Sequence, residues 1–258
     1  MESDNEIIVI KVGTDTVTEN SHLNGVVMAR IAKQISELRE QGKRVILVSS
    51  GAVGAGRSLL PDGVDEGVND MKQGLSSIGQ TMLMDEWMHH FRRHKIMCAQ
   101  GLVKEGDFEN GEGTENMQRA LEEIHAIETA TKQAIVPIVN GNDFVTHGAI
   151  DYDNDHIAGL IAETVGATRV VFLTDVDGLY DRDPEEEQAQ LIREVHAGVD
   201  DWSKYIVQKG ESDNHMGSKC EVSERLAIAG VDVNIGNGSV ENAIHQLLNH
   251  EIGTRFYV

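Results

Sequence analysis

The sequence is poor in cysteine, proline and basic residues. Its two cysteines, Cys98 and Cys220, cannot build a disulfide framework, so a reducing compartment such as the cytoplasm is expected. Only three prolines occur, and no low-complexity linker divides the chain, which predicts one domain over residues 1–258. No window approaches the ~20 apolar residues that span a bilayer. The first apolar run, residues 7–10, follows acidic residues, so no signal peptide is expected.

Basic residues are scarce relative to acidic ones. The chain has 22 Lys+Arg against 43 Asp+Glu, a formal charge of −21. That charge argues against nonspecific binding to nucleic acid or to an anionic membrane. The 40% hydrophobic and 25% charged composition is typical of a globular protein with a sizeable core. An anionic substrate would therefore need a site made locally positive by a few bases and backbone amides.

Short β-branched runs alternate with amphipathic helical stretches. Strands are predicted at residues 6–12, 43–48, 96–103, 134–139, 169–173 and 231–235. Helices are predicted around residues 27–38 and at 71–91, 115–131, 154–165, 219–229 and 240–248. This alternation predicts an α/β fold, a three-layer αβα sandwich with a mostly parallel central sheet.

Ligands of such sheets bind beyond the carboxyl ends of the strands. The first predicted strand ends with Lys11 and the turn residue Gly13, which places an ammonium group where it can hold phosphates. The second ends in Ser50-Gly51, the start of a segment with three glycines before a predicted helix. Glycine and a helix N-terminus both favour an anion. Each pattern alone also fits a plain tight turn, but two at successive strand ends indicate a site.

Acids and amides gather after two later predicted strands. Asp143 follows the strand at 134–139, and Asp153, Asn154 and Asp155 stand at the start of a predicted helix. One of these could simply cap the helix. Like charges packed so tightly repel unless something positive or a hydrogen-bonding substrate lies nearby. The cluster is therefore a second candidate part of the site.

Several common motifs are missing. The chain has no G-x-x-x-x-G-K-[ST] loop, no G-x-G-x-x-G after the first strand, and neither H-R-D nor D-F-G of the protein kinases. The acids around Gly178 do not have the EF-hand spacing. His89, His90 and His94 lack a partner carboxylate in a recognised ligand pattern. We therefore expect no metal site built from side chains alone.

Taken in order, these segments resemble the amino acid kinase family. The resemblance is carried by residues 10–14, 48–56, 135–143, 153–155 and 174–180. The Asp-Gly-Leu-Tyr of residues 177–180 is shared widely in that family, whereas the Asn-x-Asn-Asp of residues 140–143 is similar to members that phosphorylate L-glutamate. The chain ends about where their kinase domain would, so it resembles the short form without a C-terminal PUA domain.

The resemblance implies an amino acid kinase fold with an amino-acid-binding N-terminal lobe and an ATP-binding C-terminal lobe. It implies phosphorylation of the γ-carboxylate of L-glutamate with ATP and Mg²⁺, the first step toward proline. By position, Lys11 and Lys219 would contact the ATP phosphates and Asp155 would orient both lysines. The other implied residues are Ser50, Gly51, Asp143 and Asn154 for glutamate, and Thr174, Asp175 and Gly217 for the nucleotide. A cytoplasmic homo-oligomer, dimer or tetramer, with proline as a candidate inhibitor is also implied.

Two other interpretations stay open. A sister enzyme of the family could act on acetylglutamate, carbamate, UMP or an isoprenoid phosphate, although Asp143 favours a free amino acid because an ammonium group needs an anionic partner. A noncatalytic ligand sensor on the same fold is the alternative of a different class. The joint presence of Lys11, Asp155 and Lys219 argues against it. Residues 212–219 depart from the family's glycine-rich run but keep its lysine.

Overall fold

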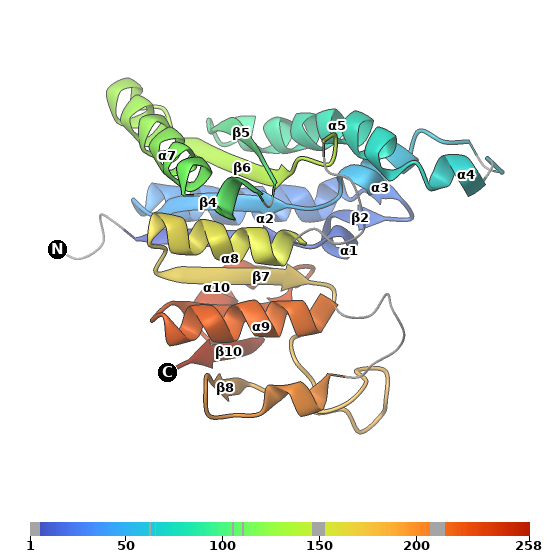
Figure 1. Ribbon diagram of the computed structural model, residues 1–258, viewed down its shortest axis with the longest axis vertical. Helices are drawn as coiled ribbons and strands as arrows, with labels where there is room; N and C mark the ends of the chain where they lie inside the picture. Colours follow the sequence, from blue (N-terminus) through green and yellow to red (C-terminus); the bar gives the residue numbers. More distant parts are fainter. Residues whose placement is uncertain are drawn as a thin grey trace.

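The computed structural model describes residues 6–61, 63–64, 66–104, 106–109, 111–145, 153–206 and 215–258. Within these residues an eight-stranded sheet has the order β5-β6-β4-β1-β7-β9-β10-β8 (Figure 1). The strands are β1 (Ile7–Val12), β4 (Arg44–Ser49), β5 (Met97–Val103), β6 (Ile135–Gly141), β7 (Arg169–Thr174), β8 (Glu194–His196), β9 (Asp232–Asn237) and β10 (Thr254–Tyr257). A small hairpin of β2 (Thr18–Glu19) and β3 (His22–Leu23) lies apart from this sheet.

The prediction of a mostly parallel sheet is confirmed. β1 pairs in parallel with β4 on one side and β7 on the other, and within the described part of this sheet β10 against β9 is the antiparallel pair. Every residue of β1 is buried, which explains its unbroken run of apolar residues around Lys11. The carboxyl ends of β1, β4, β6 and β7 therefore lie at one edge of the sheet.

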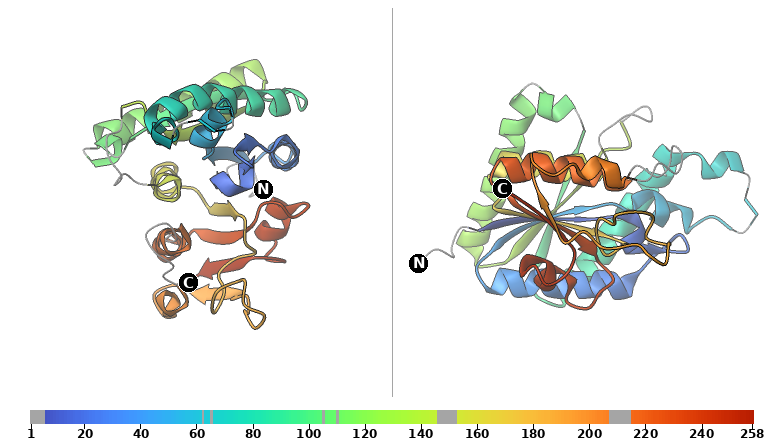
Figure 2. Two further views of the ribbon diagram at one scale, coloured as in Figure 1. Left: turned by 90° about the vertical axis from the view of Figure 1, so that its right-hand side faces the viewer. Right: turned by 90° about the horizontal axis from the view of Figure 1, so that it is seen from below.

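Helices cover both faces of the sheet, as predicted (Figure 2). The principal helices are α2 (Gly25–Glu40), α5 (Lys72–Arg92), α7 (Glu112–Thr131), α8 (Asn154–Val165), α9 (His215–Ile228) and α10 (Ala243–Leu248). The shorter ones are α1 (Thr14–Val17), α3 (Ala52–Arg57), α4 (Glu66–Asn69), α6 (Gly106–Glu109) and the 3₁₀ turn η1 (Trp202–Tyr205). None of the helices in the described residues has the length and apolar character to cross a membrane.

Two hydrophobic cores result, one on each face. Ile8, Ile10 and Val12 of β1 pack toward α2, α5 and α10. Ile7 and Val9 point the other way, into the core formed with α7, α8 and α9. This alternation is the period of two of a strand, and it makes β1 the centre of the three-layer sandwich.

The sequence placed most elements correctly but misjudged several ends. α8 has the predicted bounds because its ends carry strong signals: the side chain of Asp153 caps its start, and Gly166 takes a left-handed conformation (φ 63°) at its end. α9 begins at His215, so the prediction that Lys219 starts this helix is wrong. α7 begins at Glu112 and not at residue 115, and α10 begins at Ala243 and not at residue 240.

Candidate active site

A cavity of about 860 Å³ opens at the carboxyl ends of β1, β4, β6 and β7, a size typical of small-molecule sites. It is lined by most of the residues that the sequence singled out: Lys11, Ser50, Gly51, Asp143, Asn154, Asp155, Thr174, Asp175 and Lys219. Gly217 is not among the lining residues; it lies in the first turn of α9, between Met216 and Lys219. Segments far apart in the sequence thus meet at one edge of the sheet.

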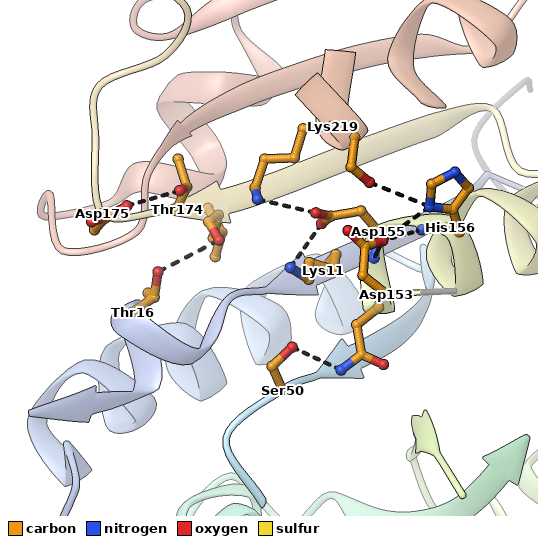
Figure 3. A network of polar contacts seen from close by, with 12 residues as sticks. Lys11, Thr16, Ser50, Asp153, Asp155, His156, Thr174, Asp175 and Lys219 are labelled. Atoms are coloured by element: carbon orange, nitrogen blue, oxygen red, sulfur yellow. Dashed lines mark hydrogen bonds and ion pairs between the residues drawn. The ribbon is translucent and has the colours of Figure 1, made fainter. Parts of the chain in front are cut away.

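Two buried lysines converge on one carboxylate at the centre of the cavity (Figure 3). Lys11 Nζ lies 2.7 Å from Asp155 Oδ1, and Lys219 Nζ lies 3.0 Å from Asp155 Oδ2. The three residues are 5%, 1% and 4% exposed in the order Lys11, Asp155, Lys219. Two cations against one anion leave an excess positive charge where water is largely excluded, which is a strong attraction for a phosphate.

The protonation of Lys11 reflects this setting. Burial lowers the pKa of the Lys11 ammonium, the nearby charge of Lys219 lowers it too, and the Asp155 carboxylate opposes both. Asp155 therefore does more than neutralise charge, because it favours the cationic form of a lysine whose pKa burial lowers. The alternative that Asp155 merely caps α8 is wrong: Asp153 is the N-cap and accepts hydrogen bonds from the Asp155 and His156 backbone N–H groups at 3.1 and 3.0 Å.

A network of neutral side chains forms another wall of the cavity. The Asn154 amide donates to Ser50 Oγ at 2.7 Å and to Asn140 Oδ1 at 3.0 Å. Asn140, which is buried, donates in turn to Gln80 Oε1 of α5 at 2.8 Å. This chain of hydrogen bonds links α8, β4, β6 and α5, and it fixes where the amide groups point.

Asp143 supplies the negative charge of this wall. Its carboxylate accepts a hydrogen bond from Ser76 Oγ of α5, and it lines the cavity together with Lys72 at the start of the same helix. Sequence reasoning did not assign Ser76, Lys72 or Asn140 to the site. Asn140 lies within the Asn-x-Asn-Asp segment that resembles glutamate-phosphorylating enzymes. Ser76, 67 positions from Asp143 and inside a helix, had no sequence signal.

The glycines after β4 have different roles from the one expected. Gly51 lines the cavity with a positive φ of 107°, a conformation that favours glycine. Gly56 instead lies against α5, where a Cβ atom would collide with the carbonyl oxygen of Leu75, and Gly79 of α5 lies equally close to Ala52. The segment therefore owes part of its glycine content to the packing of α3 on α5 and not to an anion.

The ends of β1 and β7 form the remaining wall. Gly13 N donates to the Leu173 carbonyl at 3.0 Å, which holds the turn after β1 against the end of β7. Thr174 Oγ1 donates to Asp175 Oδ1 at 3.0 Å, and both residues face the same cavity as Lys11. The lysine pair is thus next to a wall of turns and short polar side chains.

Comparison with known proteins agrees with this architecture. Residues 6–233 match the model of the amino acid kinase family. The chain belongs to the amino acid kinase family. It is 36% identical over 260 residues to a Thermoanaerobacter sp. (strain X514) protein named "Glutamate 5-kinase", an alignment that covers 96% of this chain and 67% of that protein. A Methanococcoides burtonii protein of the same name is 32% identical over 263 residues, covering 98% and 68%. The chain is therefore a kinase.

Solved structures of the family share the fold. Isopentenyl phosphate kinase of T. acidophilum superposes with a TM-score of 0.66 at 18% identity, covering 97% of this chain and 99% of that one. Carbamate kinase from Giardia lamblia gives 0.63 at 16% identity, covering 99% of both chains. At these identities the likeness confirms the amino acid kinase fold and leaves the substrate to the residues of the cavity.

Proposed function

We propose that this kinase transfers the γ-phosphoryl group of ATP to the γ-carboxylate of L-glutamate, the first step of proline synthesis. The observation that carries the proposal is the cavity itself, in which two buried lysines on Asp155 lie beside a wall of amides that contains the Asp143 carboxylate. The first feature suits phosphoryl transfer, and the second suits an amino acid with one ammonium and two carboxylate groups. The relatives named glutamate 5-kinase support the same substrate.

On the phosphate side, Lys11 and Lys219 would contact the transferred group and the leaving ADP. Phosphoryl transfer depends mainly on positioning and on stabilisation of charge, so preorganised cations contribute most when they need not move. Asp155 holds both ammonium groups within 3.0 Å of its oxygens. It would act by orienting them and not as a base, because a γ-carboxylate is already ionised at neutral pH.

On the amino-acid side, Asp143 would bind the α-ammonium group of glutamate. Its hydrogen bond from Ser76 fixes the carboxylate at the cavity wall. The Ser50 hydroxyl and the backbone N–H of Gly51 would donate to the substrate carboxylates, and Asn154, whose amide donates to Ser50 and Asn140, would position that hydroxyl. The family resemblance implies an amino-acid-binding N-terminal lobe and an ATP-binding C-terminal lobe, and Lys11, from the N-terminal strand β1, would reach the phosphate side.

Magnesium fits the proposed site as the companion of ATP. Mg²⁺ is usually bound through phosphate oxygens and water with one or two carboxylates. Asp15 and Asp175 line the cavity and are the carboxylates that would hold it. When bound, the ion would neutralise charge on the β- and γ-phosphates, while Lys11 and Lys219 act on the transferring group.

The proposal is tested by substrate choice. Release of ADP is measured with L-glutamate, acetylglutamate, carbamate, UMP and isopentenyl phosphate, and hydroxylamine is added to trap an acyl phosphate as its hydroxamate. We expect turnover with L-glutamate and a hydroxamate product. Preference for another acceptor would assign the chain to a sister activity, and no turnover with any of the five would favour a ligand sensor.

Assembly and regulation are separate parts of the proposal. A homo-oligomer, dimer or tetramer, in the cytoplasm and inhibition by proline follow from the family resemblance. Light scattering after gel filtration measures the first, and proline added to the glutamate assay measures the second. A monomer at all concentrations would contradict the proposed homo-oligomer. Unchanged turnover in the presence of proline would contradict the proposed inhibition.

A further inference from the structure

A second polar cluster lies beside Asp155 and takes no part in the proposed transfer. His156 Nδ1 lies 3.1 Å from Asp153 Oδ1 and 3.3 Å from Ser218 Oγ (Figure 3). Both partners meet the same ring nitrogen, so the three residues cannot relay a proton from hydroxyl to carboxylate as a hydrolase triad does. Instead, the His156 ring links Asp153, the residue before α8, to Ser218 in the first turn of α9.

This link between α8 and α9 lies next to the contact between Asp155 and Lys219. Asp155 of α8 binds Lys219 of α9, and the next residue of α8, His156, meets the preceding residue of α9, Ser218. The two helices lie side by side and both begin at the cavity edge of the sheet (Figure 1). Anything that moves Ser218 therefore moves the backbone that carries Lys219.

We propose that His156 is a positioning residue whose Nδ1–H links Asp153 to Ser218, most strongly when the ring is protonated, and thereby holds Lys219 beside Asp155 for the nucleotide phosphates. This inference rests on the proposed function only for the identity of the acceptor, because the phosphate side is common to any ATP-dependent kinase on this site. It assigns to a residue next to the site a role in nucleotide affinity and in its pH dependence.

The charges that face His156 decide the direction of that dependence. The hydrogen bond to Asp153 raises the pKa of His156, burial opposes this, and Glu221 of α9 raises it further while Arg225 lowers it. Arg225 is itself paired with Glu163 of α8 at 3.0 Å. The protonated form is thus complete below the ordinary histidine pKa and is lost as the pH rises through the raised value.

Loss of that proton changes the charge of the whole cluster. With His156 protonated, three cations (Lys11, Lys219 and His156) face two anions, Asp153 and Asp155; with it neutral the charges balance. Burial raises the pKa of Asp153, but hydrogen bonds from the His156 ring, Ser218 and the His156 backbone lower it by more, so Asp153 stays ionised. Nucleotide binding should therefore weaken as the pH rises.

The test compares Mg·ADP affinity by calorimetry from pH 6 to 9 in the wild type, His156→Asn and His156→Ala. Asparagine keeps a donor near the position of Nδ1 without a titratable charge, and alanine removes both. His250→Asn is the matched control, because His250 is paired with Asp232 at 2.8 Å and is not among the cavity-lining residues. Ratios between variants cancel the titration of the nucleotide.

We expect the wild type and His250→Asn to lose about 3- to 10-fold in affinity across the titration of His156, the size of one hydrogen bond. His156→Asn should lack that change, and His156→Ala should bind more weakly at low pH and lower kcat more than the KM for glutamate. An unchanged pH profile in His156→Asn, or wild-type kcat in His156→Ala, would overturn the inference, as would absence of Mg·ADP binding. Failure to phosphorylate glutamate with nucleotide binding intact would overturn the proposed function alone.

Discussion

The phosphate side and the amino-acid side of the cavity differ in the kind of group that builds them: the first uses charged side chains and the second mainly neutral ones. On the phosphate side, the buried side chains of Lys11 and Lys219 each lie within 3.0 Å of the buried Asp155 carboxylate. On the amino-acid side, neutral donors and acceptors, Asn154, Asn140 and Gln80, form a chain of hydrogen bonds, and Asp143 supplies the negative charge of this wall. The first side concentrates charge, and the second fixes directions.

The difference follows from what each side must recognise. A transferring phosphoryl group spreads charge over several oxygens, so fixed cations stabilise it whatever the acceptor is. An amino acid is told from its analogues by hydrogen bonds that an incorrect substrate leaves unpaired. Changes on the phosphate side should therefore affect kcat and stability, whereas changes on the amino-acid side should affect KM for the acceptor.

The largest effect is expected for Asp155→Asn, which breaks the charged side. Removing one partner of a buried ion pair costs about 3 to 5 kcal/mol in unfolding free energy, because the other charges stay buried. Burial already lowers the pKa of Lys11, and loss of Asp155 lowers it further. The unfolded state then binds more protons than the folded state, so stability of the variant should rise from neutral to alkaline pH.

Chemical denaturation at pH 7 and pH 9 measures this effect. Asp143→Asn serves as the comparison, since Asp143 is only half-buried and has no lysine partner among its described contacts. Equal stability of Asp155→Asn and the wild type at pH 7 would show that Asp155 does not stabilise the buried charges of Lys11 and Lys219. That result would contradict the description of the phosphate side.

Lys219→Met is expected to lower kcat about 10²- to 10³-fold, the usual loss for one preorganised charge donor. The KM for glutamate should change little, because the acceptor is held on the other side of the cavity. Lys33→Met is the matched control: Lys33 is exposed and pairs with Glu37 one helical turn away. Steady-state kinetics of both variants decide, and wild-type kcat in Lys219→Met would remove that lysine from the reaction.

Asp143→Asn tests the amino-acid side. Loss of one charged hydrogen bond to the substrate ammonium should lower kcat/KM for glutamate by about 30- to 200-fold, mainly through KM. Asp175→Asn provides the contrast, because Asp175 lies at the end of β7 on the nucleotide side and should alter the KM for ATP. An unchanged glutamate KM in Asp143→Asn would contradict its assignment.

The sequence predicted the framework well for physical reasons. Central strands such as β1 and β7 are buried on both faces, so they appear as unbroken apolar runs that need no partner to be recognised. β8 and β10 were not predicted: three and four residues at one edge of the sheet are too short to show a period. The start of α9 was placed four residues late: Ser218, a residue type that often caps a helix, stands directly before Lys219 but lies inside the first turn of α9.

The site was predictable where it follows a strand directly. Lys11, Ser50 and Thr174 each lie at the carboxyl end of a strand, so the topology alone brings them together. Contacts that depend on the angle of a packed helix left no sequence signal. Ser76 reaches Asp143 only because α5 packs beside the ends of β4 and β6, where it bonds to Ser49 and Asn140. His156 meets Ser218 only because α8 and α9 run side by side. Within the altered segment at residues 212–219, residues 212–214, which include the acidic Asp213, lie outside the described residues.

The smallest effect, and the sharpest separation of the two sides, is expected for Ser76→Ala. Ser76 is buried and donates to the Asp143 carboxylate, so its loss frees that carboxylate to rotate without removing its charge. The KM for glutamate should rise about 3- to 10-fold, the size of one hydrogen bond, with kcat and the KM for ATP unchanged. Ser77→Ala is the control in the next position of the same helix, because Ser77 Oγ donates to the Gln73 carbonyl at 2.6 Å and not to the cavity. Kinetics with glutamate and ATP varied separately measure both variants.

A fall in kcat for Ser76→Ala would show that the neutral wall also positions the reacting groups. The division of the cavity into a side that sets kcat and a side that sets KM would then fail at this residue.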